Sequence, residues 1–249
     1  MTTYDTSQVK ESVRERYAAV ALREAACCSP PAATEDACCS PAEVRFTSKS
    51  EADAVVDKAD LGLGCGNPTA FEDIEPGNTV LDLGSGAGVD VFRAAKLVGD
   101  DGHAIGVDMT VEMVELARAN ATRGGFRNVE FRLGEIESLP VTDGSIDVVL
   151  SNCVINLVPD KHRAFAEMHR VLAVGGRFVI SDIVTVGELS EDVRSDLSQW
   201  VGCVSGAMDY GDYLALIEET GFRDVEVLTR HGYGDGAPTE SITVRGFKR

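Results

Sequence analysis

Cysteine and glycine are the residues of this sequence whose types and spacing indicate chemistry. Cys65, Cys153 and Cys203 stand in three different sequence frames, LGLGCGNP, SNCVINL and WVGCVSGA. Thiolates are soft ligands that select soft, thiophilic centres. The chain has seven cysteines and no C-x-x-C spacing of the kind found in zinc ribbons and thioredoxin-type motifs. We therefore expect reactive or ligand thiols rather than a disulfide framework.

A glycine-rich turn is the second chemical feature. The apolar run at residues 80–83 leads directly into Gly84-Ser85-Gly86-Ala87-Gly88. Glycine permits a tight turn and close approach of a ligand to the backbone, and the helix that follows adds a partial positive charge. The spacing G-x-G-x-G is one residue shorter than the dinucleotide motif. Asp108 ends the next expected strand, where a carboxylate can bind both hydroxyls of a ribose.

The elements that must position these residues alternate along the chain. Short β-branched runs separated by helical periodicity predict an α/β fold with a doubly wound, Rossmann-like parallel sheet. The expected strands are 80–83, 103–108, 129–133, 146–151 and 177–181, and the helices between them are 90–97, 111–122 and 160–172. A small C-terminal α+β addition follows, with helices at 191–201 and 210–220 and strands at 224–229 and 241–247. We expect it to complete the sheet and cover the carboxyl edge, where ligands bind in such folds.

Composition excludes several classes of function. With 249 residues, 44% of them hydrophobic, the chain can bury a sizeable core. The net charge of -18 argues against nucleic acid and anionic membranes, since phosphate binding relies on clustered Lys and Arg. We interpret the charge as a solvated acidic surface suited to solubility or high salt. No apolar run approaches the roughly 20 residues that span a bilayer, and the N-terminus is polar, so we expect a cytoplasmic protein.

Three sequence runs, VLDLGSGAG, GVDMT and GEIESLP, resemble successive motifs of class I S-adenosylmethionine methyltransferases over about residues 80–182. The resemblance implies that Asp82 and the glycines line the methionine end of the cofactor, and that Asp108 binds its ribose. Met109 would cover the adenine face, and Ile136 with Glu135 or Glu137 its edge. The implied cofactor-binding set is Asp82, Gly84, Ser85, Gly86, Gly88, Asp108, Met109, Glu135, Ile136, Glu137 and Asn152. Many relatives have Asp at position 135, and a Rossmann-like domain that binds NAD is the alternative.

The cysteine frames narrow the resemblance. LGLGCGNP, SNCVINLVPDK and the W-x-x-C-x-x-G-A run at 200–207 resemble arsenite S-adenosylmethionine methyltransferases, enzymes of arsenic detoxification, over about residues 43–221. The resemblance implies that Cys153 and Cys203 are the principal arsenic ligands and Cys65 a third ligand or redox partner. The family uses a fourth cysteine near the N-terminus, to which Cys38 or Cys39 corresponds. The implied substrates are As(III) thiol complexes, and the implied reductant is glutathione or a thioredoxin-type protein.

These assignments predict that the chain is divided into three parts. Residues 1–45 would hold an amphipathic helix at 7–24, with Val9, Val13, Tyr17 and Leu22 on its apolar face, and a mobile cysteine-rich loop in which ACCSP occurs twice. Residues 46–183 would form the Rossmann-like domain that binds S-adenosylmethionine. Residues 184–249 would complete the sheet and cover the substrate pocket.

Two other functions stay open at this point. A methyltransferase acting on another small molecule, through a carbon or oxygen nucleophile, would need an aromatic pocket, and only 6% of the residues are aromatic. A non-catalytic metalloid-binding protein would use the paired cysteines, yet it has no need of an intact glycine turn and Asp108. Calorimetry with S-adenosylmethionine separates this second alternative from an enzyme.

The doubled cysteines of the loop give a first prediction. Replacing Cys38 and Cys39 together by serine is expected to reduce turnover of arsenite strongly and to spare methylation of a trivalent monomethyl substrate. Arsenite takes three sulfur ligands, whereas methylarsenic(III) already carries one carbon and takes two. Arsenic speciation after incubation measures both reactions. The Cys27 and Cys28 pair is the matched control, and its replacement should do much less; equal damage to both substrates would contradict this division of roles.

Overall fold

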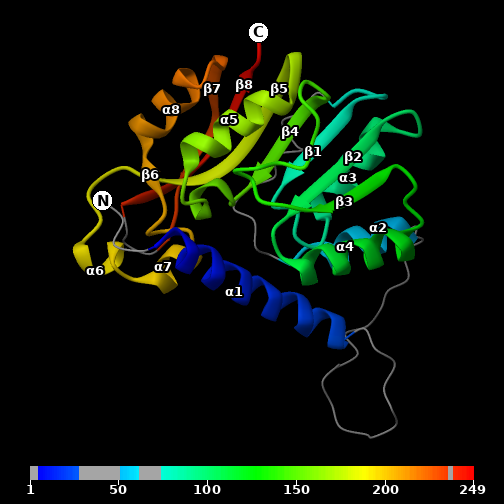
Figure 1. Ribbon diagram of the computed structural model, residues 1–249, viewed down its shortest axis with the longest axis horizontal. Coiled ribbons are helices and arrows are strands. Elements are labelled where there is room, and N and C mark those ends of the chain that lie inside the picture. The colour runs from blue at the N-terminus through cyan, green and yellow to red at the C-terminus, as the bar shows by residue number, and fades with distance from the viewer. Residues whose placement is uncertain (1–4, 28–50, 62–73, 235–237) are drawn as a thin grey trace, which may run out of the picture.

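Residues 5–27, 51–61, 74–234 and 238–249 are described by a computed structural model of the chain (Figure 1). The expectations for Cys65, for Cys38 and Cys39 and for the mobile loop lie outside the described residues. In the described part the strands are β1 Thr79–Leu83, β2 His103–Asp108, β3 Val129–Leu133, β4 Ile146–Asn152, β5 Leu172–Thr185, β6 Met208–Asp209, β7 Arg223–Gly232 and β8 Thr239–Phe247. The helices are α1 Thr6–Cys27, α2 Glu51–Ala59, α3 Val89–Val98, α4 Val111–Gly124, α5 Lys161–Val171, α6 Glu191–Arg194, α7 Leu197–Val201 and α8 Tyr210–Glu219, with a 3-10 turn, η2, at Ile155–Leu157.

The strands form one sheet in the order β3-β2-β1-β4-β5-β8-β7, and the short β6 pairs with β5. Strands β1 to β5 run parallel, whereas β8 pairs antiparallel with both β5 and β7. The expected doubly wound sheet is therefore confirmed, and the C-terminal strands extend it. The helix expected at 191–201 is two short helices instead, because the Asp196 side chain accepts a hydrogen bond from the Ser198 amide and begins a new helix there.

Two hydrophobic cores lie on opposite faces of the sheet. Successive side chains of a strand point to opposite faces, so neighbouring residues of β1 enter different cores. Val80 packs in the core that α2, α3 and α4 cover, whereas Leu81 and Leu83 pack in the core that α5 and α8 cover. Figure 1 shows the sheet between these two helical layers.

Strand order reverses between β1 and β4, which brings the chemical residues together. From β1 the chain continues to β2 and β3 on one side, and from β4 to β5 and β8 on the other. A crevice forms at the carboxyl edge of such a switch point. The glycine turn after Leu83, Asp108 at the end of β2 and Asn152 at the end of β4 all lie at this edge.

Helix α1 lies next to α4 and α7 (Figure 1). Val9 and Val13 are buried and Tyr17 is partly buried, as the amphipathic pattern predicts. Leu22, assigned to the same apolar face, is 59% exposed, whereas its neighbour Ala21 is buried. Val9, Val13 and Tyr17 are four positions apart, but Leu22 follows Tyr17 by five and so leaves their face of the helix. Its place on that face was a wrong prediction.

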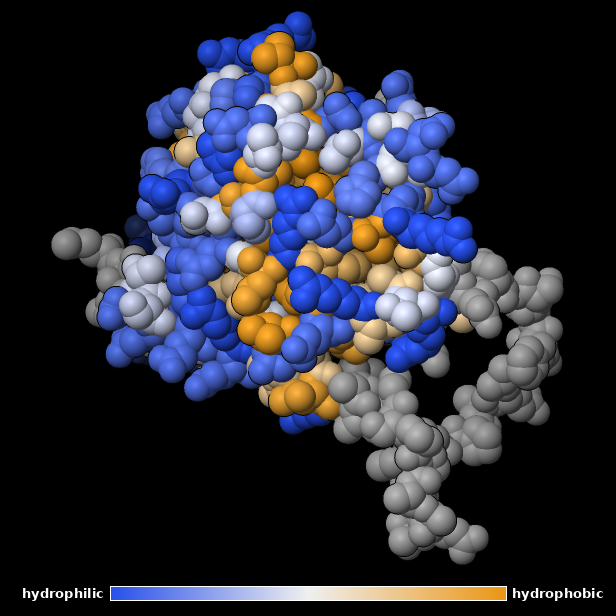
Figure 2. All heavy atoms as spheres, turned by 45° about the vertical axis from the view of Figure 1, so that its right-hand side comes forward, coloured by the Kyte–Doolittle hydropathy of each residue, from blue (hydrophilic) through white to orange (hydrophobic). Residues whose placement is uncertain are grey.

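The surface is mostly hydrophilic on the face that Figure 2 shows, and the hydrophobic residues gather toward the middle of that view. Within the described ranges, none of the helices is both long enough and apolar enough to cross a membrane.

Two leucines on the sheet give a matched test of this packing. Leu81 in β1 is fully buried, whereas Leu133 at the end of edge strand β3 is 51% exposed. Leu81→Ala is expected to lower the free energy of unfolding by about 2–5 kcal/mol through lost burial and a cavity, and Leu133→Ala by about 0.5 kcal/mol or less. Urea unfolding followed by circular dichroism measures both. Similar losses in the two variants would contradict the placement of the core.

Candidate active site

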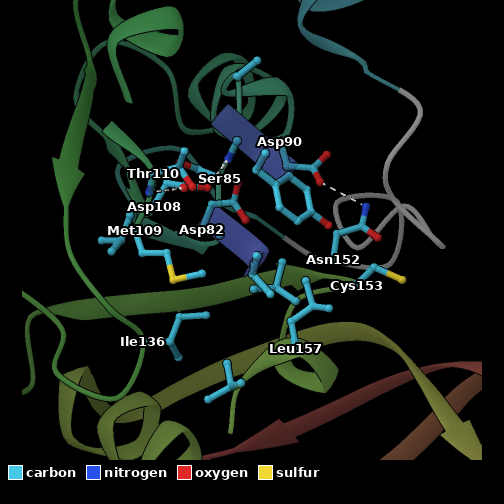
Figure 3. A pocket seen from close by; sticks show the side chains of 18 of the residues that line it. Asp82, Ser85, Asp90, Asp108, Met109, Thr110, Ile136, Asn152, Cys153 and Leu157 are labelled. Atoms are coloured by element: carbon cyan, nitrogen blue, oxygen red, sulfur yellow. Dashed lines mark hydrogen bonds between the residues drawn. The ribbon is translucent and has the colours of Figure 1, made fainter. Parts of the chain in front are cut away.

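A cavity of about 240 Å³ opens at the carboxyl edge of β1, β2 and β4. Most of the predicted cofactor residues line it: Asp82, Gly84, Ser85, Gly86, Asp108, Met109, Ile136, Glu137 and Asn152. Cys153 and Leu157 lie in the same wall, next to Asn152. Figure 3 shows the side chains from the three strand ends gathered around one space. The structure therefore brings the glycine turn and one of the predicted thiol residues into a single site.

The glycine turn is shaped by left-handed backbone. Gly84, Gly86 and Gly88 all have positive φ values. At Gly86 a Cβ would meet no atom within 4 Å, so the backbone there is open to a ligand in the cavity. Gly88 is different: a Cβ would lie 2.8 Å from the Phe131 ring and 2.9 Å from that of Phe92. Gly88 does not line the cavity and permits α3 to pack closely on the sheet.

Asp108 is held by backbone amides. Its Oδ2 accepts a hydrogen bond from the Gly86 amide at 3.0 Å, and its Oδ1 accepts one from the Thr110 amide at 2.8 Å. Burial raises the pKa of Asp108, while the amide hydrogen bonds from Thr110 and Gly86 oppose that rise. An ionised carboxylate has about four acceptor sites, so two remain for ligand hydroxyls. The carboxylate is thus oriented in advance and can accept hydrogen bonds from the hydroxyls of a ligand.

Asp82 and Asp90 place two buried carboxylates behind the turn. Asp90 accepts hydrogen bonds from Arg93 at 2.9 Å and from the Asn152 amide at 3.3 Å (Figure 3). Burial raises the pKa of Asp82 well above its usual value, and the charges of Asp90 and Asp108 raise it further. No hydrogen bond to the Asp82 carboxylate occurs among the described residues. A buried carboxylate without a partner fits a ligand that carries positive charge, as the ammonium and sulfonium of S-adenosylmethionine do.

Helix α1 closes one side of the cavity, a contribution that sequence reasoning missed. Lys10, Val13 and Tyr17 line the cavity. The Lys10 Nζ lies 2.7 Å from Glu135 Oε2 and 3.0 Å from Glu137 Oε1, and Arg14 also pairs with Glu135. The hydrogen bond from Lys10 lowers the pKa of Glu135.

Glu135 therefore anchors α1 and lies outside the cavity wall, whereas Glu137 and Ile136 line it. Of the two acidic residues considered for the adenine edge, the geometry favours Glu137. The sequence held one signal for the docking of α1. Lys10 and Arg14 are one helical turn apart beside the apolar face of the helix, so both can pair with acidic residues of the surface that the helix covers.

Cys153 and Cys203 share an unusual backbone conformation. Their φ values are 60° and 69°, and Asp224 is the one other non-glycine residue with positive φ among the described residues. Such conformations are uncommon and cost about 1–3 kcal/mol each, and they concentrate at functional sites. Both residues are buried, and the Cys203 Sγ donates to the Cys153 carbonyl at 3.7 Å. Cys153 is disulfide-bonded, and Cys203 is a free thiol.

The two cysteines lie in an apolar cluster with Val9, Val13, Leu157 and Trp200. Burial raises the pKa of the Cys203 thiol to about 12, and the negative charge of Asp182 adds to the rise. At neutral pH this thiol keeps its proton. The surroundings thus favour a neutral, thiophilic ligand over a hydrated ion.

Four features together define a class I methyltransferase domain. They are the doubly wound sheet, the glycine turn after β1, the acidic residue at the end of β2 and the cavity at the switch point. The family model described as a methyltransferase domain matches residues 74–221. A solved phosphoethanolamine N-methyltransferase 2 from Haemonchus contortus, in complex with S-adenosylhomocysteine, shares the fold with a TM-score of 0.62 at 18% identity, over 72% of this chain and 51% of that one.

Two nearer relatives identify the branch of that class. A crystal structure of an arsenic(III) S-adenosylmethionine methyltransferase from Chlamydomonas reinhardtii is 37% identical, with a TM-score of 0.69, over 81% of this chain and 75% of that one. An arsenite methyltransferase from Halobacterium salinarum is 49% identical over 235 residues, 91% of this chain. The chain belongs to the arsenite methyltransferase family. It spans 60% of the length of the Halobacterium relative and 63% of one from Aquipseudomonas alcaligenes.

The unpartnered carboxylate gives a prediction in which stability and binding move in opposite directions. Asp82→Asn is expected to weaken binding of S-adenosylmethionine about tenfold or more, the loss typical of a charged contact. Because the pKa of Asp82 is raised in the folded state, the folded state binds more protons and this group lowers stability as pH rises. The variant should therefore unfold at a higher temperature than the wild type at pH 8, and the gap should shrink toward about pH 4.

Calorimetry measures the affinity and thermal unfolding the stability. Asp147→Asn is the matched control, since Asp147 accepts a hydrogen bond from the Thr79 amide at the opposite edge of the sheet. It should leave cofactor affinity unchanged. A wild-type affinity in Asp82→Asn would show that the cation does not face this carboxylate.

Proposed function

We propose that this protein methylates trivalent arsenic, as arsenite or methylarsenite, with S-adenosylmethionine as the methyl donor. The observation that carries the proposal is the pair Cys153 and Cys203. Both are buried and have left-handed backbone, and the Cys203 Sγ lies 3.7 Å from the Cys153 carbonyl oxygen. Their position beside the cavity of the glycine turn supports a ligand site next to the cofactor. The named activity of the Halobacterium and Chlamydomonas relatives points to the same substrate.

The thiols would hold arsenic by exchange with its hydroxyl groups. Each As–S bond forms as an As–OH bond breaks, and the thiol proton leaves with the hydroxyl as water. This exchange is compatible with Cys203, because the raised pKa of its thiol keeps the thiol protonated until arsenic binds. No separate general base is needed, because arsenic attacks through a lone pair and loses no proton.

The cofactor set would comprise Asp82, Asp108, Met109 and Ile136 with the glycine turn. S-adenosylmethionine supplies an electrophilic methyl group when it is bound. Asp108 would fix the ribose through the hydrogen bonds that orient its carboxylate, and Asp82 would stabilise the cationic end. Asn152, which contacts Asp90 and precedes Cys153, would connect the cofactor end with the thiol end.

A thiol reductant belongs to the same proposal. Methylation takes arsenic from the trivalent to the pentavalent state, so two electrons must return to it before another round, and two thiols supply them by forming a disulfide. The disulfide at Cys153 supports a role for this cysteine in such exchange. Glutathione or a thioredoxin-type protein would then reduce it, with Cys65 as third ligand or redox partner, in a cytoplasmic setting.

The cavity offers little to a methyltransferase of aromatic substrates. Among the described residues that line it, Tyr17 is the one aromatic side chain. The cysteine cluster beside it is aliphatic apart from Trp200 and the partly buried Tyr17 and Tyr233. A small, thiophilic substrate therefore fits better than a quinone or sterol precursor.

Serine substitution at the two cysteines tests the proposal. Cys153→Ser and Cys203→Ser are each expected to abolish arsenic methylation while leaving affinity for S-adenosylmethionine near the wild-type value, because a serine oxygen is too hard to replace a thiolate on arsenic. The assay incubates purified protein with As(III), glutathione and labelled S-adenosylmethionine and then separates the arsenic species. Substantial activity in either variant would remove that cysteine from the ligand set, and no methylated arsenic with the wild type would overturn the proposed function.

A further inference from the structure

Asn156 lies between the two cysteine turns without lining the cofactor cavity. It is fully buried in η2, the turn that follows Cys153. Its backbone is fixed at both ends: the amide donates to the Asp182 carboxylate, and the carbonyl accepts a hydrogen bond from the Lys161 Nζ at 3.2 Å. The Asn156 backbone is therefore held by two side chains that do not line the cavity.

The side chain of Asn156 reaches across to the other cysteine. Its Nδ2 donates to the Cys203 carbonyl at 3.3 Å, and the amide also hydrogen-bonds the Cys203 side chain. The Oδ1 of the same amide has no partner among the described residues. An unsatisfied buried acceptor is costly and calls for an explanation other than stability.

The turn η2 and the segment from Trp200 to Gly206 also contact each other through backbone atoms. Trp200 Nε1 donates to the Leu157 carbonyl at 3.1 Å. A Cβ at Gly206 would overlap the Asn156 carbonyl oxygen and lie 3.0 Å from the Trp200 ring. Glycine at 206 is thus required for the Cys203 segment to dock on η2.

Two buried charged residues, Lys161 and Asp182, support the contact between η2 and the Cys203 segment. Burial lowers the pKa of Lys161 to about 8 and raises that of Asp182 to about 7. Burying these two charged groups therefore costs folding free energy. Lys161 lies 5.6 Å from the centre of the Trp200 ring, and Asp182 accepts a hydrogen bond from the Tyr213 hydroxyl at 3.1 Å. A strained backbone conformation persists only where the surrounding contacts hold it in place. The contacts of Asn156, Trp200, Lys161 and Asp182 hold the left-handed backbone of Cys203 in this way.

We propose that Asn156 is a positioning residue of the arsenic site, which holds the Cys203 thiol at a set spacing from Cys153 by bridging the two cysteine turns. The inference rests on the proposed function and names a residue that touches neither cofactor nor arsenic. Once the disulfide of Cys153 is reduced, arsenic meets two thiols whose spacing is already set, so binding does not have to order the Cys203 turn.

The test uses the sole tryptophan of the chain as a reporter, because Trp200 lies in the contact between the two segments. Reduced full-length protein is titrated with phenylarsine oxide, a trivalent arsenical that takes two thiols, and Trp200 fluorescence follows binding. Asn156→Ala and Asn156→Asp, which lose the amide donor, are each expected to weaken binding about tenfold, the value of one buried hydrogen bond. The KM for arsenite should rise similarly, whereas affinity for S-adenosylmethionine should stay within about twofold.

Asn128→Ala is the matched control for lost stability. The Asn128 amide donates to the Ala95 and Gly99 carbonyls, both at 2.9 Å and both at the end of α3. This variant should lower the unfolding temperature and leave arsenical binding unchanged. Gly206→Ala, which separates the segments without altering the amide, should weaken arsenical binding as Asn156→Ala does.

The outcomes separate this inference from the proposed function. Wild-type affinity for phenylarsine oxide in Asn156→Ala and Gly206→Ala, with the wild type itself binding, would overturn the positioning role alone. Equal weakening by Asn128→Ala, or equal loss of S-adenosylmethionine binding, would show a general loss of structure and also overturn it. Failure of the wild type to bind the arsenical would overturn the proposed function.

Discussion

The reversal of strand order between β1 and β4 is the constraint on which the rest of the site depends. The connections that leave β1 and β4 turn to different sides of the sheet, so a crevice remains at the carboxyl edge between them. The glycine turn, Asp108 and Asn152 reach this crevice from three parallel strands. Cys153 follows Asn152 directly, so the proposed thiol site adjoins the proposed cofactor site.

Stability is reduced at this edge in several places. Asp82 is buried and has no hydrogen-bond donor in the part of the chain that the structure describes. Cys153 and Cys203 have left-handed backbone, and Lys161 and Asp182 are buried charged groups. Each of these features costs folding free energy. Asp82 and Cys153 line the crevice, whereas Cys203, Lys161 and Asp182 belong to the contact next to Cys153. The two apolar cores on either side of the sheet supply the burial that offsets them. The proposed site, for a cationic cofactor and a thiophilic atom, would account for these costs.

Helix α1 shows how a distant segment completes the site. It brings Val9 and Val13 to the cysteine cluster and Lys10 to Glu135 and Glu137, more than a hundred residues away in the sequence. Its amphipathic pattern predicted a helix with one buried face, yet nothing in that pattern indicates which surface the face covers. The burial of Val9 and Val13 and the ion pairs with Glu135 and Glu137 together fix the docking, and Glu135 lies outside the cavity wall.

Local sequence determined the elements and the residue types at their ends. β-branched runs, helical periodicity and the glycine turn predicted the parallel strands, their order along the chain and the residues Asp82 and Asp108 at the edge, because these signals depend on neighbours a few positions apart. Tertiary structure decided which of these residues meet. Gly88 packs on Phe131 rather than lining the cavity, and the Cys203 turn contacts that of Cys153 through Asn156 and Gly206. Such contacts join residues about fifty positions apart, and their geometry depends on how whole elements pack, which no local pattern records.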